Sequence, residues 1–251
     1  MNKINIHGIM ASAIVATCAM GTTSQHVWAE EPIAYTQAEL FLEQNNTDGD
    51  LGLHFNIDGE GWRRPRLKGP NPNGNKQKEL LNILVRGKLG NVIGLTQLRC
   101  ESAEPPFDEL PRDEFLSLFP EGEYTFFGKT VDRIRMKSMT TLTHIMPGEV
   151  ELVSPEEDGE VPADEDLVIE WATLDDPAPP ENLIEFYEVV VEKDQDGEFH
   201  RVFSVHMLPT DSTLRCPAEF LEAGKDYKVE IIAQETSGNR SSIEVPFVTE
   251  E

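Results

Sequence analysis

The strongest candidate for metal chemistry is the oxygen-rich run Asn45-Asn46-Thr47-Asp48-Gly49-Asp50-Leu51-Gly52. Ca²⁺ collects about six to eight oxygen ligands, and alternating oxygen-bearing side chains in a glycine-containing turn can supply them. An EF-hand is excluded, because a leucine occupies its sixth position, which requires glycine, in either possible frame. The run predicts either a calcium site of Asp48 and Asp50 with Asp58 or Glu60, or an Asx turn that enters a strand.

A second candidate is Trp62 with Arg63, Arg64 and Arg66, a basic and aromatic cluster in an acidic chain. A tryptophan ring can stack on a sugar, and arginine side chains suit carboxylates and sulfates. The same residues are also typical of an exposed strand edge whose arginines meet the protein's own carboxylates. The cluster therefore predicts either a ligand-binding patch at Trp62, Arg63 and Arg64 or such an edge.

Catalytic motifs are missing from the sequence. It contains no His-Glu-x-x-His helix motif, no Gly-x-Ser-x-Gly elbow and no phosphate-binding glycine loop. Sequence alone cannot choose a glycosidase pair among 46 Asp and Glu residues. His200 and His206 are interpreted as partly exposed strand residues. We expect no catalytic residue, and no cofactor other than the possible calcium.

The chain has 251 residues, with 46 Asp and Glu against 21 Lys and Arg, and a formal net charge of −25. This balance argues against a nucleic-acid partner, because phosphate binding needs a clustered Lys/Arg surface. It disfavours binding to an acidic membrane surface for the same reason.

Residues 1–29 have the pattern of a secretory signal, with Lys3, an apolar stretch from Ile9 to Met20 and small or β-branched residues at Val27 and Ala29. We expect cleavage after Ala29 and a secreted or periplasmic protein. An uncleaved anchor or lipidation at Cys18 is the alternative. The apolar stretch is shorter than the ~20 residues that span a bilayer, and no other run comes close, so no transmembrane segment is expected in the mature chain.

Two cysteines remain after residue 29, Cys100 and Cys216, one in each half of the chain. Two are too few for a disulfide scaffold, so the cores must be stabilised by apolar burial. A single Cys100–Cys216 bridge and two buried free thiols are both compatible with the sequence.

A change of composition near residues 146–149 predicts three parts: the signal peptide 1–29, a domain over 30–147 and a second domain over 148–251. In residues 30–147, strands are predicted at 51–57, which alternates, at 80–85 and 96–100, which are apolar enough, and at 123–129 and 137–145, which have strand patterning. One short helix should begin near Pro111 and end at Pro120. The fold class is therefore mainly β, with a mostly-β, sandwich-like first domain.

Residues 148–251 read as short strands at 167–171, 186–192, 201–208, 212–216, 227–233 and 242–248, which is the size and rhythm of a β-sandwich. Within them Trp171, Tyr187 and the run 220–233 resemble the fibronectin type III domain, an immunoglobulin-like sandwich. The resemblance implies that Trp171, Tyr187, Leu221 and Tyr227 form the core. Ala223 departs from the family, which usually has proline there. The whole layout resembles a group of exported bacterial proteins with a fibronectin type III-like end, and it implies no activity.

The residues that carry the resemblance are expected to pack in the core, so binding must be carried out by loops and exposed strands. We therefore expect a non-catalytic binding, adhesion or scaffold protein with a protein or glycan partner. Candidate binding loops are the Pro-rich segment 175–180 and the turns near Asp48 and Trp62. The alternatives are a carbohydrate-active hydrolase or accessory carbohydrate-binding module with its site in residues 30–147, and a calcium-stabilised structural module. The sequence indicates no oligomeric state.

Overall fold

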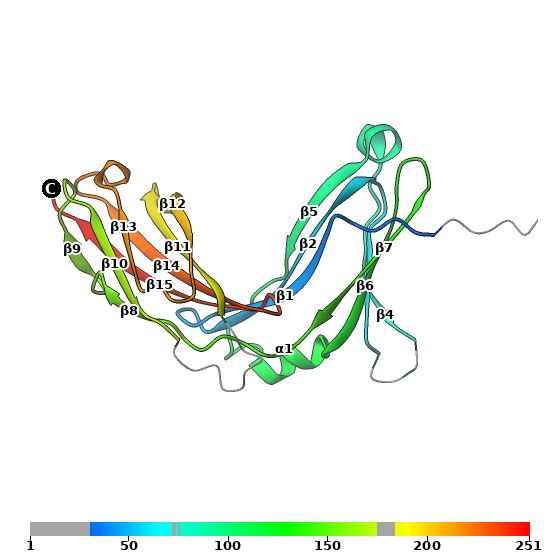
Figure 1. The fold of residues 1–251 in the computed structure, drawn as a ribbon, viewed down its shortest axis with the longest axis horizontal. Helices are drawn as coiled ribbons and strands as arrows, with labels where there is room; N and C mark the ends of the chain where they lie inside the picture. The colour runs from blue at the N-terminus through cyan, green and yellow to red at the C-terminus, as the bar shows by residue number, and fades with distance from the viewer. Residues whose placement is uncertain (1–30, 72–73, 75, 175–183) are drawn as a thin grey trace, which may run out of the picture. The chain divides into compact units, whose positions relative to one another are not determined.

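The computed structural model of the protein describes residues 31–71, 74, 76–174 and 184–251, and its fold is mainly β (Figure 1). The expected signal peptide and the Pro-rich loop 175–180 lie outside the described residues. Residues Pro32–Glu251 form one compact unit. No helix within the described residues is long and apolar enough to cross a membrane.

Residues 32–147 fold into strands that belong to two sheets. The strands are β1 (Gln37–Asn45), β2 (Asp50–Trp62), β3 (Arg66–Gly69), β4 (Lys78–Asn82), β5 (Leu95–Glu101), β6 (Gly122–Lys129) and β7 (Arg135–Leu142). One sheet has the order β4-β3-β6-β7, and β1, β2 and β5 belong to a longer sheet. The short helices are η1, a π-helix (Leu89–Ile93), and α1 (Arg112–Leu118). Pro111 precedes α1, as the sequence predicts.

Alternation along β2 separates the core from the exposed face. Leu51, Leu53, Phe55 and Ile57 are buried in the first hydrophobic cluster, which also contains Trp62, Tyr124 and Phe126. Because successive side chains of a strand point to opposite faces, His54 and Asn56 lie on the other face of the sheet. This alternation supplies the polar residues of the cleft described below.

Residues 148–251 form a fibronectin type III-like sandwich. Its strands are β8 (Glu151–Ser154), β9 (Gly159–Val161), β10 (Leu167–Ala172), β11 (Ile184–Gln195), β12 (Glu198–Met207), β13 (Thr213–Cys216), β14 (Asp226–Glu235) and β15 (Arg240–Thr249), with a 3₁₀ turn η2 (Ala218–Phe220). One sheet is β13-β10-β8, and β12-β11-β14-β15 forms the other side. The acidic segment 149–166 contains β8 and β9, which its charge and two prolines concealed from sequence analysis.

The four residues that the resemblance implied for the core are all buried in the second hydrophobic cluster. The rings of Trp171 and Tyr187 meet edge to face, 5.7 Å apart. The hydroxyl of Tyr227 accepts a hydrogen bond from the Glu222 amide at 2.8 Å and lies 3.5 Å from the Phe220 carbonyl oxygen. This hydroxyl ties the turn before β14 back to the sandwich, as in a tyrosine corner. Leu221 is buried beneath that turn.

A long sheet with the order β12-β11-β14-β15-β1-β2-β5 runs through both halves of the protein (Figure 1). Its two parts meet where β1 pairs in parallel with β15, with Glu43 opposite Arg240. The sequence did not predict β1 or this pairing. Both hydrophobic clusters pack on one face of the long sheet, and most of the residues that line the cleft on the opposite face are polar.

Buried polar groups reinforce the meeting of β1 and β15, and we call this region the joint. Asn239, which is 1% exposed, accepts a hydrogen bond from the Leu42 amide at 2.8 Å. Its side-chain amide donates to the carbonyl oxygens of Thr143 and Ile145 at 3.0 and 2.7 Å. One side chain therefore connects β1, the segment after β7 and the β14–β15 turn.

Candidate functional site

The oxygen-rich run 45–52 forms the β1–β2 turn and part of the joint. Asn45 Oδ1 accepts the amides of Thr47 and Asp48, which makes an Asx-type turn. The Asn46 side chain donates to Ser241 Oγ at 2.7 Å, and Thr47 Oγ1 accepts from the Glu244 amide at 2.8 Å. Asn45 Oδ1 thus closes the turn itself, whereas the Asn46 side-chain nitrogen and the Thr47 hydroxyl bind the turn to β15.

The predicted calcium set Asp48, Asp50 and Asp58 is not brought together. Asp50 begins β2, whereas Asp58 lies eight positions along the same extended strand, about 26 Å away at strand spacing. Within the described ranges, no group of three His, Cys, Asp or Glu residues could hold a metal ion. The prediction of a site that combines these three aspartates is wrong, because a continuous strand separates them.

The predicted ligand patch at Trp62, Arg63 and Arg64 also needs correction. Trp62 is 0% exposed in the first hydrophobic cluster, and its Nε1 donates to the Thr96 carbonyl oxygen at 3.3 Å. Its ring therefore cannot stack on a ligand. Arg63 is half-buried and Arg64 is exposed in the segment between β2 and β3, away from the cleft.

Both cysteines are free thiols. Cys216 is buried in the second hydrophobic cluster, and Cys100 packs against the first. The bridge that the sequence left open is therefore not formed, because each thiol belongs to a different core. Burial raises the pKa of Cys216 to about 11, so this thiol is not activated as a nucleophile.

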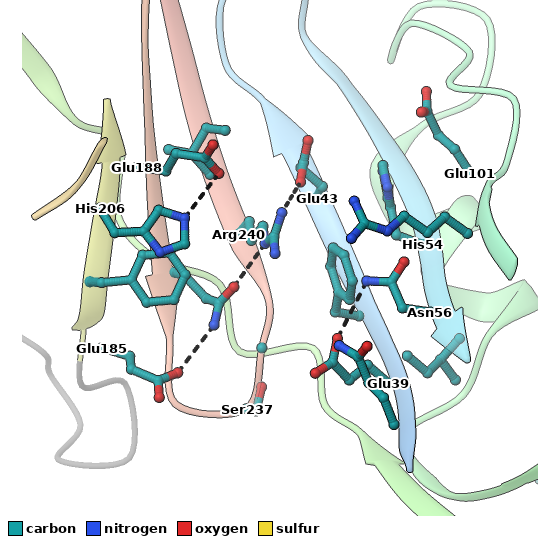
Figure 2. Close-up of a pocket in the computed structure, with 18 of the residues that line it drawn as sticks. Glu39, Glu43, His54, Asn56, Glu101, Glu185, Glu188, His206, Ser237 and Arg240 are labelled. Atoms are coloured by element: carbon teal, nitrogen blue, oxygen red, sulfur yellow. Dashed lines mark hydrogen bonds and ion pairs between the residues drawn. The ribbon is translucent and has the colours of Figure 1, made fainter. Parts of the chain in front are cut away.

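A cleft of about 910 Å³ lies on the polar face of the long sheet (Figure 2). Side chains from β1, β2 and β5 line one side of it, and side chains from β11, β12, β14 and β15 line the other. Its charged lining residues, among those that the structure describes, are Glu39, Glu43, Glu101, Glu185, Glu188, Glu230, Arg99, Arg201 and Arg240. Parallel pairing at the joint thus creates a surface that neither half has alone.

A stacked column stands at the centre of the cleft. The Arg240 guanidinium lies 4.5 Å from the centroid of the Phe41 ring, and the Phe41 and His54 rings stack at 5.2 Å. Arg240 Nη1 is 3.5 Å from Glu43 Oε2, and His54 Nε2 is 3.0 Å from Glu104 Oε1. Burial raises the pKa of Glu104, although the hydrogen bond with His54 opposes that rise. The column fixes the side chains across the joint.

A second stack lies on the fibronectin-like side. The rings of Phe186 and His206 are 4.5 Å apart and nearly parallel, and His206 Nε2 is 3.6 Å from Glu188 Oε2. Glu188 also accepts from Arg201 at 2.8 Å and from Ser204 at 2.8 Å. One carboxylate therefore organises three neighbouring side chains on β12.

Glu230 is the most perturbed carboxyl group of the cleft. Its pKa is raised to about 7, first by burial and then by the nearby carboxylates of Glu244, Glu43 and Glu192, while Lys228 lowers it. Glu230 also stands directly opposite Glu244 in the β14–β15 ladder. Like charges in opposed positions destabilise a sheet, so protonation of Glu230 near neutral pH removes its repulsion with the Glu244 carboxylate.

We expect Glu230→Gln to stabilise the protein in mildly alkaline solution by about 2–3 kcal/mol and to have little effect near pH 4.5. The folded pKa lies above the ordinary value, so folded Glu230 keeps a proton that the unfolded chain releases between about pH 4.5 and 7. The wild type therefore loses stability as pH rises through that window, and the glutamine variant lacks this loss. Denaturant unfolding across pH measures it, with the exposed Glu157→Gln as control. If the free energies of unfolding of the wild type and the E230Q variant changed with pH in the same way, the prediction would be wrong.

Few of the cleft residues carry a signal in the local sequence. Of the four histidines after residue 29, His54 and His206 line it, but their spacing to each other and to Arg240 gave no local motif. The available signal was alternation: the polar residues of β2 and of β14 occupy every second position. Alternation identifies an exposed face, but it does not show that two exposed faces share one sheet.

No protein-family model matches the chain, and no curated protein matches it. Among solved structures, the chain is similar to the FN1–FN3 domains of chicken CNTN1, with 11% identity and a TM-score of 0.33, over 86% of this chain and 65% of that one. It is also similar to the fibronectin(III)-like modules of Clostridium thermocellum CbhA, with 11% identity and a TM-score of 0.30, over 85% of this chain and 95% of that one. The fibronectin type III-like fold of residues 148–251 follows from their own strand order and core.

Proposed function

We propose that this is an exported, non-catalytic binding module that holds a basic segment of a protein partner in the cleft of the long sheet. The observation that carries the proposal is the continuous polar face, to which both halves contribute side chains around one hollow. The proposal includes export with cleavage after Ala29 to a secreted or periplasmic location, and it requires no cofactor.

Charge supports a basic ligand. Arg240 and Arg201 already lie against Glu43 and Glu188, so their charge is largely neutralised within the protein. Exposed carboxylates at Glu39, Glu101 and Glu185 remain around the opening. A surface with excess negative charge attracts lysine and arginine side chains and increases the rate of encounter with them.

The ring contacts argue against a glycan. A sugar is normally held by an open aromatic face, but Phe41 lies between Arg240 and His54 and is 5% exposed. The Phe186 ring is covered on one side by His206. The cleft therefore offers charged and hydrogen-bonding groups rather than a stacking platform, which suits a peptide better than a sugar ring.

The test uses a fluorescein-labelled peptide of alternating lysine and serine, with a glutamate–serine peptide as its matched partner. We expect the lysine peptide to bind in fluorescence anisotropy, more weakly as salt rises, and the glutamate peptide not to bind. Glu39→Lys combined with Glu185→Lys should weaken binding about tenfold or more, because both reverse charges at the opening.

The control variant combines Glu109→Lys with Glu157→Lys, which makes the same charge change at exposed sites outside the cleft. It should bind nearly as well as the wild type. Equal losses in the two variants would mean that the peptide responds only to net charge. That result, or the absence of any binding by the lysine peptide, would overturn the proposal.

A hydrolase is the second candidate, and Glu230 is the observation that favours it. A carboxyl group protonated near neutral pH beside other carboxylates is the arrangement of a general acid in glycoside hydrolysis. We rank it second because the Glu230 side chain is only 14% exposed and lies beneath Arg201. Release of nitrophenol from aryl glycosides by the wild type, lost in Glu230→Gln, would favour catalysis over binding.

A further inference from the structure

One end of residues 32–147 brings together three loops that are distant in sequence. They are residues 63–64 after β2, residues 84–93 between β4 and β5, and residues 129–135 at the β6–β7 turn; we call them together the basic end. The Arg63 amide donates to the Lys129 carbonyl oxygen, and the Val85 amide donates to the Arg63 carbonyl oxygen, both at 3.0 Å. The Val131 amide donates to Gly61 at 3.0 Å. In Figure 1 this is the end with the coil that precedes β5 and the turn that joins β6 to β7.

Aliphatic side chains are unusually exposed at the basic end. Val92 and Ile93 of η1 are 71% and 67% exposed, and Leu89 is 52% exposed. Leu84 and Ile134 are 49% and 40% exposed. Two of the three loops therefore present apolar side chains to the outside in a group, whereas singly scattered exposed aliphatic residues need no explanation.

The same loops concentrate positive charge in a chain whose net charge is −25. The cations are Arg63, Arg64, Arg86, Lys88, Lys129, Arg133 and Arg135, and the only acidic residue in the three loops is Asp132. In the described part of the chain, the ion pairs include none of Arg63, Arg64, Arg86, Lys88, Lys129 and Arg133. Unlike Arg201 and Arg240 of the cleft, these six form no ion pair with a carboxylate in the described part of the chain.

From this combination we propose that the basic end binds the surface of a membrane that contains anionic lipids. Protruding aliphatic side chains enter the boundary between headgroups and acyl chains, while the surrounding lysines and arginines meet the lipid phosphates. The acidic remainder of the protein does not prevent this, because charges farther than about 8 Å from the surface are largely screened at physiological salt. In any other orientation the acidic surface would come within that distance of the lipid and be repelled, so the basic end faces the membrane. The proposal is independent of the cleft.

A membrane fits these loops better than a protein partner does. The apolar residues are all aliphatic, whereas the centres of protein interfaces are enriched in aromatic residues.

The experiment measures cosedimentation of the compact unit Pro32–Glu251 with vesicles of phosphatidylcholine, with and without phosphatidylglycerol. We expect binding only to the vesicles that contain phosphatidylglycerol, and weaker binding at high salt. Arg86→Glu with Lys88→Glu should weaken it about thirtyfold or more. Val92→Ser with Ile93→Ser should weaken it about tenfold. The control, Arg215→Glu with Lys225→Glu, makes the same charge change at exposed sites of the other half and should bind like the wild type.

A second readout separates insertion from simple attraction. Val92→Trp places a reporter at the most exposed position, while Trp62 and Trp171 are buried. Its emission should shift to shorter wavelength with anionic vesicles and be quenched by brominated lipid. No binding by the wild type, equal binding by the R86E/K88E variant and the control, or an unshifted V92W emission would each overturn the proposal. If the wild type binds no vesicles but captures an acidic protein that the R86E/K88E variant does not capture, the basic end belongs to a protein partner instead.

Discussion

Trp62→Ala is expected to lower the free energy of unfolding by about 3–5 kcal/mol. Trp62 is 0% exposed and is among the largest fully buried side chains of the described residues. Its removal leaves a cavity where the end of β2 meets the first hydrophobic cluster, and it leaves the Thr96 carbonyl oxygen without its indole donor. Urea unfolding followed by circular dichroism measures the loss.

Two further variants make the Trp62 result specific. Trp62→Phe keeps most of the buried volume and should cost clearly less than Trp62→Ala. Phe199→Ala removes a ring that is 42% exposed and should cost much less than the loss of Trp62. A Trp62→Ala protein as stable as the wild type would show that the ring is not part of the core, and would restore the ligand-binding reading of this residue.

Asn239→Leu is the second large effect, and we expect a loss of about 3 kcal/mol or more. Leucine has a similar volume, so the substitution removes hydrogen bonds with little change in packing. It leaves the Leu42 amide and the Thr143 and Ile145 carbonyl oxygens buried without this partner. Buried polar groups that lose their partners carry the full cost of desolvation.

The Asn239 experiment also tests how the two halves are joined. Hydrogen exchange should increase first at β1 and at the segment after β7, because Asn239 bonds to both. The control is Asn82→Leu, at an exposed residue of β4. Lysine-peptide binding should weaken in the Asn239 variant even where it remains folded, because the cleft needs both sides of the joint. Unchanged stability and unchanged exchange at Leu42 would refute the role given to Asn239.

The joint gives the oxygen-rich run a structural explanation. Asn45, Asn46 and Thr47 have the composition of a calcium turn, but Asn45 Oδ1 closes the β1–β2 turn, and the Asn46 side-chain nitrogen and the Thr47 hydroxyl hold that turn on β15. A turn that docks on another strand and a turn that binds a cation need the same small polar side chains. Composition could not separate them, since the deciding partner is almost 200 residues away in the chain.

The mainly β fold was readable from local patterns. Local sequence patterns predicted most of β2, β5, β6, β7, β10, β11, β12, β13, β14 and β15, and Pro111 and Pro120 bracketed α1. The turn dipeptide Asp196-Gly197 has positive φ at both residues, 60° and 92°, as a two-residue hairpin requires. The predicted strand at 80–85 is β4 at Lys78–Asn82 instead. These elements were predictable because side-chain periodicity and turn conformation depend on residues that are close together in the sequence.

By itself the sequence determined the fold class, the fibronectin type III-like half with Trp171 and Tyr227 in its core, and the acidic charge. Only the tertiary structure decided that Trp62 is buried, that β1 joins β15 to build the cleft, and that cations from three separate loops gather at one end. The physical reason is the separation along the chain between the residues that interact. Periodicity and turn chemistry act over a few residues, whereas a shared sheet and a charged surface depend on residues that folding brings together from distant parts of the chain.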